Sequence, residues 1–238
     1  MSRRQRIRNL LKGIETGDPA AVEVVNPDKY IQHNPQTHEG GEGLATLFAR
    51  IAKSSPRVNI VRAFEDGDFV FAHTEYDFAT RRIGFEVFRF EGDYAVEHWD
   101  NIQQRKGPNA AGHSMVDGPT EVFDLESTED NRALVRSMVE GVFIAGRDHV
   151  SNYLGADFAD HGPELTLPDK IRSLDYQRVH RILAEGNFVL VASEGTLDGA
   201  ATALYDLFRV SDGKVVEHWD TIETIPPRDE WKNQNGKF

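Results

Sequence analysis

The sequence predicts an α+β protein made of two tandem copies of one domain, and three observations support this. The string Val-Glu-His-Trp-Asp stands at residues 96–100 and again at residues 216–220. Helical patterns come first in each half and strand patterns follow, which is typical of α+β domains. Shorter matches precede the string in both halves and in the same order, at residues 66–70 and 185–189 and at residues 32–35 and 160–163.

The repeat divides the 238 residues into a first domain at 1–118, a linker at 119–127 and a second domain at 128–238. Each copy has ~110–120 residues, which is enough to bury a hydrophobic core of its own. The stretch at 107–129 is rich in Gly, Pro, Ser and Asp, a composition typical of a connector.

Each copy is expected to open with an amphipathic helix. In the first copy Ile7, Leu10, Leu11 and Ile14 share one helix face, and the run 17–19, Gly-Asp-Pro, ends it. A second helix is expected at 43–52, whereas the second copy has only the shorter segment 164–171 in that place. The first helix of the second copy is predicted from Leu134, Val135, Met138, Val139 and Val142, and stops near Gly146.

Four strands are expected to follow in each copy and to form an antiparallel sheet. Glycine-containing turns at 65–68, 91–93 and 211–214 separate them. The predicted strands lie at 57–64, 69–78, 84–90 and 94–102, and at 176–183, 188–196, 201–210 and 215–222.

The repeated string presents two different faces. Strand alternation puts Glu97 and Trp99 on one face, and His98 and Asp100 on the other. A three-residue loop at 211–213 would pair Asp206 with His218 and Leu204 with Asp220, whereas a two-residue loop would shift the pairing by one and break this grouping. Two carboxylates and an imidazole among apolar side chains are typical of an acid–base pocket. With the three-residue loop, the shared face carries Asp206, Phe208, Val216, His218 and Asp220, and in the first copy Glu86, Phe88, Phe90, Val96, His98 and Asp100.

Composition excludes several classes of function. Lys plus Arg total 27 against 39 Asp plus Glu, a net charge of −12 that disfavours nucleic-acid binding. The chain has no cysteine, which excludes disulfides and thiolate metal sites and suits the cytoplasm. No apolar run approaches the ~20 residues of a membrane span. The histidines His33, His73 and His98 lie on separate elements without short ligand spacing, so no metal site is expected.

These motifs resemble those of a known family. Residues 30–35, Tyr-Ile-Gln-His-Asn-Pro, and 96–103, Val-Glu-His-Trp-Asp-Asn-Ile-Gln, resemble the SnoaL-like group of the nuclear-transport-factor-2-like (cystatin-like) superfamily. More narrowly, they resemble the predicted SnoaL-like aldol-condensation-catalysing enzymes. The tails at 114–120 and 233–238 add to the likeness.

The resemblance implies two cystatin-like α+β barrels. Each would hold a conical pocket between a curved sheet and its helices, with an Asp or His as acid/base and no cofactor. Members of this superfamily pair sheet to sheet, so the copies are expected to form a covalent pseudo-dimer that buries Trp99 and Trp219. Further homo-oligomerisation stays open. Gln103 and Glu223 stand where SnoaL-like cyclases carry a catalytic Asp.

We expect the first copy to hold the complete site, because the second lacks about two turns of the helix that roofs the pocket. His98 is the expected base and Asp100 its orienting carboxylate. By resemblance to ketosteroid-isomerase-like members, Glu86 is an acid or oxyanion donor. His33 lies at a helix-to-loop corner, where it either reaches the pocket mouth or caps a helix or orders the turn. Further ligand-contacting candidates are Asn34, His73, Phe88 and Gln103, with His161, Asp206, His218 and Asp220 in the second copy.

Two functions follow as hypotheses. The first is a cofactor-free acid/base enzyme that acts on a small apolar carbonyl compound by aldol condensation or cyclisation, isomerisation or dehydration. The second is a non-catalytic module that binds a small ligand or assembles with a partner, with structural histidines. A catalytic pocket brings titratable groups together around a cavity, whereas a structural histidine has its polar atoms satisfied away from one.

Overall fold

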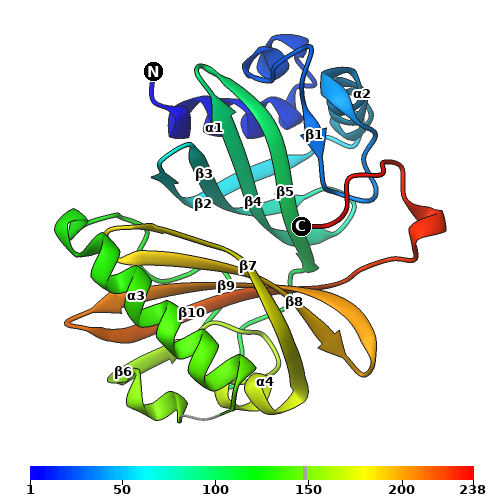
Figure 1. Cartoon of the computed structure of the whole chain (residues 1–238). Coiled ribbons are helices and arrows are strands. Elements are labelled where there is room, and N and C mark those ends of the chain that lie inside the picture. Colours follow the sequence, from blue (N-terminus) through cyan, green and yellow to red (C-terminus); the bar gives the residue numbers. More distant parts are fainter. Residues whose placement is uncertain (147–148) are drawn as a thin grey trace. The chain divides into compact units, whose positions relative to one another are not determined.

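A computed structural model describes residues 1–146 and 149–238, which form two compact units (Figure 1). The first unit comprises Met1–Arg105 and Pro226–Phe238, and the second Lys106–Ile225. These limits differ from the predicted 1–118, 119–127 and 128–238. The repeat marks where the sequence was duplicated, whereas each unit includes the tail that follows the last strand of the other copy.

The first unit contains a five-stranded sheet in the order β1-β5-β4-β3-β2. Strand β1 runs parallel to β5, and the other neighbours are antiparallel, so the sheet is mixed rather than wholly antiparallel as predicted. Its elements are α1 (Arg3–Lys12), β1 (Ile31–Gln32), α2 (Gly40–Ala52), β2 (Arg57–Asp66), β3 (Phe69–Asp77), β4 (Arg81–Glu91) and β5 (Tyr94–Gln104).

The second unit repeats this arrangement, with the sheet order β6-β10-β9-β8-β7 and β6 parallel to β10. The prediction of two tandem α+β domains is therefore confirmed, while their sheet-to-sheet packing stays a prediction. Within the described residues no helix is both long and apolar enough to cross a membrane. The elements are α3 (Thr128–Met138), β6 (Leu154–Asp160), α4 (Leu167–Ser173), β7 (Leu174–Glu185), β8 (Phe188–Leu197), β9 (Ala200–Ser211) and β10 (Lys214–Thr224).

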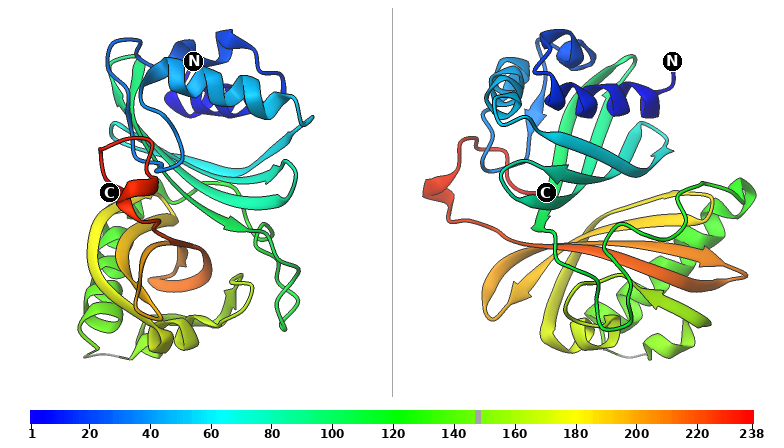
Figure 2. Two further views of the ribbon diagram at one scale, coloured as in Figure 1. Left: turned by 90° about the vertical axis from the view of Figure 1, so that its right-hand side faces the viewer. Right: turned by 180° about the vertical axis from the view of Figure 1, so that it is seen from behind.

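Helix α1 covers the inner face of the first sheet, as its apolar spacing predicts (Figure 2). The Ser2 side chain accepts a hydrogen bond from the Gln5 amide, which satisfies one of the free N–H groups at the helix start. Ile7, Leu10 and Leu11 are buried in one cluster with side chains of β3 and β4. This burial anchors the helix above the sheet and leaves room for a cavity beside it.

The turn between β9 and β10 is shorter than predicted. It has two residues, Asp212 and Gly213, with φ angles of 50° and 68°. Two consecutive residues with positive φ are typical of a type I′ hairpin, and Ser211 pairs with Lys214 across it. The expected three-residue loop is therefore wrong.

A β-bulge restores the face that the shorter turn would have reversed. The register shifts between Val215 and Glu217, so that His218 faces Phe208 and Asp220 faces Asp206. The pairings predicted for His218 and Asp220 are wrong by two residues, and a shift of two keeps each side chain on the same face. The bulge also puts Val215, rather than the predicted Val216, in the core.

Strands β4 and β5 have the same bulge, with Arg89 paired to Glu97 and Phe90 to Ala95. Ala95 therefore joins the core cluster at the position where Val96 was expected. The bulge places Glu86 opposite Asp100 and Phe88 opposite His98 on the inner face.

The two exchanged tails bind equivalent places. In the first unit Asn233 Nδ2 donates to the carbonyl oxygens of Asn34, at 2.7 Å, and Thr37, at 3.1 Å. The tail therefore ties down the turn that follows β1. Asn109 Nδ2 makes the matching pair in the second unit, with the carbonyl oxygens of Asp160 and Gly162.

We predict that Asn233→Ala lowers the free energy of unfolding of the first unit by about 1–3 kcal/mol, because two carbonyl groups lose their buried donor. Chemical denaturation measures the change in the free energy of unfolding. Backbone amide hydrogen exchange within residues 34–37 measures the local effect. The exposed neighbour Gln234→Ala is the control and is expected to change nothing. Equal stability of the two variants would contradict a structural role for the tail.

Candidate active site

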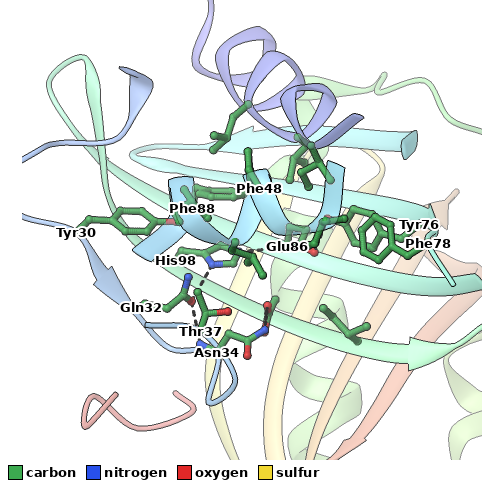
Figure 3. A pocket seen from close by; sticks show the side chains of 18 residues that line it. Tyr30, Gln32, Asn34, Thr37, Phe48, Tyr76, Phe78, Glu86, Phe88 and His98 are labelled. Atoms are coloured by element: carbon green, nitrogen blue, oxygen red, sulfur yellow. Dashed lines mark hydrogen bonds and ion pairs between the residues drawn. The ribbon is translucent and has the colours of Figure 1, made fainter. Parts of the chain in front are cut away.

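A cavity of about 90 Å³ lies in the first unit between the inner face of the sheet and the helices α1 and α2 (Figure 3). Its apolar lining comes mainly from the two helices, and its polar lining from the sheet and the turn after β1. Five predicted site residues line it: Asn34, Glu86, Phe88, His98 and Asp100. The other polar lining residues are Tyr30, Gln32, Thr37 and Tyr76.

Glu86 and His98 form a buried pair in this lining. His98 Nε2 lies 2.8 Å from Glu86 Oε2, and His98 Nδ1 lies 2.9 Å from Gln32 Oε1. The Tyr76 hydroxyl donates to Glu86 Oε1 at 2.7 Å, and the Phe88 ring stacks on the imidazole with centroids 4.3 Å apart. Such a fully bonded buried network holds its members in one geometry.

The carboxylate bonded to His98 is therefore Glu86, and not Asp100 as predicted. Asp100 accepts from Asn34 Nδ2 at 2.5 Å and from Lys237 Nζ at 3.4 Å. Sequence reasoning missed Lys237 because it belongs to the far end of the chain. Its only sequence signal was the tail motif at 233–238.

Burial and the nearby carboxylates raise the pKa of the Tyr30 and Tyr76 hydroxyls well above the ordinary value. Both side chains therefore remain O–H donors over the whole working pH range. The O–H of Tyr76 is the one that holds Glu86 in place.

His33 does not line the cavity, contrary to the prediction that it sits at the mouth. Its Nδ1 lies 2.8 Å from the Gly236 carbonyl oxygen, and its Nε2 lies 3.0 Å from Glu97 Oε1. The ring stacks on Trp99 with centroids 4.7 Å apart, and its backbone N–H donates to the His98 carbonyl oxygen. The outer face of the repeated string thus holds the turn in place.

The second unit repeats this corner. His161 stacks on Trp219 with centroids 4.5 Å apart, and its Nε2 lies 3.4 Å from Glu217. Its Nδ1 lies 2.5 Å from Asp117 Oδ1. We therefore assign His161 a structural place rather than the predicted contact with a ligand.

His73 and Gln103 also lie outside the cavity lining, contrary to prediction. His73 is fully buried, and its Nδ1 accepts from Arg62 Nη1 at 2.8 Å. Its neighbour Ala72 belongs to the inner core cluster, so strand alternation puts His73 on the opposite face. Gln103 is likewise turned away, because Ile102 lines the cavity.

Two clusters in the described part of the chain have a residue set that can bind a metal. Glu86, His98 and Asp100 bring one ligand atom each within 4.8 Å of one another. The second cluster combines residues of the tail that follows β5 with a residue of the turn after β6. These segments are far apart in sequence, so the cluster has no short ligand spacing that could predict a metal site. It consists of His113, Asp117 and His161.

The site in the second unit contains a buried lysine. Lys170 Nζ lies 2.5 Å from Asp220 Oδ2 and 3.9 Å from Asp160 Oδ1. Gly162 stands where the first copy has Asn34, and a Cβ there would lie 2.2 Å from Lys170 Nζ. Lys170, which lies on the short helix α4, thus occupies the space that corresponds to the Asn34 side chain of the first copy.

His218 lies between two carboxylates, 3.0 Å from Asp160 and 2.9 Å from Asp206. Burial opposes a charged ring, and Lys170 does too, but the two carboxylates prevail and raise the pKa of His218 to about 9. Burial likewise opposes the Lys170 ammonium, yet Asp220 and Asp160 raise the pKa of Lys170. In the first unit Gln32 stands in place of Asp160, so His98 has a single carboxylate partner.

We predict that the stability of the second unit falls as the pH rises from 6.5 towards 9. The folded-state pKa of His218, about 9, lies above the ordinary value of 6.5. Its contribution, on the order of 3 kcal/mol, is thus fully present below pH 6.5 and is lost as the pH passes through the folded value. Denaturation curves from pH 6 to 10 measure this, and His218→Gln is expected to flatten the profile. An equally steep pH dependence of stability in His218→Gln would show that His218 is not its cause.

We also predict that Lys170→Met destabilises the second unit by about 3–5 kcal/mol, because it leaves the buried Asp220 without its cation. Arg172→Met in the same helix is the control, since its ion pair with Asp169 is exposed and is worth at most ~1 kcal/mol. Denaturant titration compares the two variants. A cost for Lys170→Met no larger than that of the control would show that the buried pair is not needed.

Comparisons with known proteins add a loose likeness to solved structures. No family model matches the sequence, and no curated protein does. An NTF2-like protein from Cytophaga hutchinsonii is 15% identical with a TM-score of 0.38, and covers 43% of this chain and 91% of its own.

Two further structures show the same coverage. A protein with a ketosteroid isomerase-like fold from Catenulispora acidiphila is 18% identical with a TM-score of 0.36, over 40% of this chain and 83% of its own. IdmH from Streptomyces antibioticus, a candidate polyketide cyclase, is 16% identical with a TM-score of 0.37, over 42% and 90%. At these scores the activity has to be argued from the site itself.

Proposed function

We propose that the first unit is a cofactor-free acid/base enzyme of the SnoaL-like kind that acts on a small apolar carbonyl compound. The observation that carries this proposal is the buried Glu86–His98 pair beside Asp100 in a cavity whose remaining lining is largely apolar. Aldol condensation, isomerisation and dehydration all begin with removal of a proton next to a carbonyl group. The cysteine-free composition supports a cytoplasmic location.

The hydrogen bonds suggest different roles from those expected from the sequence. Both contacts of Asp100 come from donors, the Asn34 amide and the Lys237 ammonium, so both of its oxygens act as acceptors. We assign to it, in place of His98, the removal of the proton from carbon.

Glu86 and His98 share a proton. When His98 Nδ1–H donates to the Gln32 oxygen, the contact between Nε2 and Glu86 Oε2 needs one proton between the two atoms. We assign this shared proton to the acid step, protonation of the ligand at a second atom or at a leaving hydroxyl group. The second N–H of Asn34 is free for the carbonyl oxygen, where it would stabilise developing negative charge.

A non-catalytic binding module is the second candidate, and one observation favours it. Both ring nitrogens of His98 already have hydrogen-bond partners, and the cavity of about 90 Å³ is small. In the binding module, His98 has a purely structural role and shapes the cavity. The two candidates differ in whether a bound ligand exchanges its protons.

The decisive experiment is a thermal-shift screen of small ketones and aldehydes, followed by exchange of the enolisable proton of each hit in deuterated water. We predict that Asp100→Asn and His98→Ala each slow exchange by at least ~100-fold. Gln103→Ala, outside the cavity, serves as the control and is expected to leave the rate unchanged. Hits that bind wild-type protein but exchange no faster than in buffer would establish the binding module instead.

A further inference from the structure

Each of the two units has a buried lysine beside the same aspartate of the repeated string, and the two lysines come from unrelated elements. In the second unit Lys170 of α4 meets Asp220. In the first unit Lys237, next to the end of the chain, meets Asp100. Two different elements thus supply the same charge to equivalent carboxylates, which points to a requirement of the site rather than an accident of the tail.

The tail holds Lys237 firmly. The Gly236 carbonyl oxygen lies 2.8 Å from His33 Nδ1, and Asn235 Nδ2 donates to the Gln32 carbonyl oxygen at 3.1 Å. The lysine itself is only 4% exposed. The ammonium therefore has a defined position, although it lies one residue from the chain end.

Charge explains why the site needs this cation. Glu86 and Asp100 face each other across β4 and β5, and both are buried. Two carboxylates so close cannot both stay ionised in a buried site without cations nearby. The titratable groups around Asp100 are Glu86, His98, Tyr30, Tyr76 and Lys237, and the Lys237 ammonium is the one that makes an ion pair with Asp100.

We propose that Lys237 is a positioning residue of the first unit's site, and that its ion pair with Asp100 Oδ1 holds the carboxyl group so that Oδ2 accepts from Asn34. The C-terminal tail, which follows the second copy in sequence, therefore completes the site of the first. The catalytic consequence rests on the proposed function, whereas the ion pair and its effect on Asn34 do not.

A double-mutant cycle tests the ion pair in the full chain. Lys237→Met is expected to lower Tm by several degrees, on the order of 5 °C, because it leaves Asp100 buried without its cation. Adding Asp100→Asn to this variant is expected to recover part of the loss. Lys232→Met, an exposed lysine of the same tail, is the matched control. Losses from the two single variants that simply add would overturn the ion pair.

A local readout separates positioning from general stability. The side-chain amide resonances of Asn34 report its hydrogen bond to Asp100. They are expected to shift in Lys237→Met and to return in Lys237→Arg, which keeps the charge. With a ketone that exchanges on the wild-type protein, Lys237→Met is expected to slow the exchange, and Lys237→Arg to restore it.

The outcomes distinguish the two proposals. Unchanged Asn34 resonances in Lys237→Met would overturn the positioning role whatever the exchange data show. Absence of exchange with every ketone on the wild-type protein would overturn the proposed function, while the thermal cycle and the Asn34 resonances would still decide the role of Lys237.

Discussion

The two faces of strand β5 set the arrangement on which the first site depends. On its outer face Glu97 and Trp99 hold the ring of His33, and with it the turn after β1. On its inner face His98 and Asp100 line the cavity. One strand therefore fixes both the catalytic candidates and the turn that carries their partners. The bulge before this stretch is essential, because a shift of one residue would exchange the two faces.

The sites of the two copies differ by a few changes on the same fold. Where the first copy has Gln32 and a long helix α2, the second has Asp160 and the short helix α4. Asp160 adds a second carboxylate beside the imidazole and favours its charged form. Lys170 on α4 then takes the space of an asparagine side chain. In the second unit the buried lysine contacts both Asp220 and Asp160, whereas in the first unit Asp100 has the Asn34 amide beside the Lys237 ammonium.

Each tail that follows the last strand of one copy belongs to the unit formed by the other copy. Each tail carries an asparagine that binds backbone carbonyls of the turn, Asn109 in one unit and Asn233 in the other. Only the C-terminal tail also carries a lysine that reaches the motif aspartate. This asymmetry explains how one copy can depend on the other for a charged group even though both share a fold.

The sequence by itself determined the duplication and the order of helices and strands. These follow from the repeat and from side-chain alternation, which are local properties of the chain. The predicted turn that put Glu86, His98 and Asp100 on one inner face is wrong, and the bulge in the folded sheet restores this face. Tertiary structure alone decided which carboxylate bonds to His98, that His33 packs on Trp99, and that Lys237 reaches Asp100. The physical reason is that such contacts join segments far apart in sequence. A local sequence pattern predicts neither where a tail binds nor whether a bulge shifts the strand register by one residue.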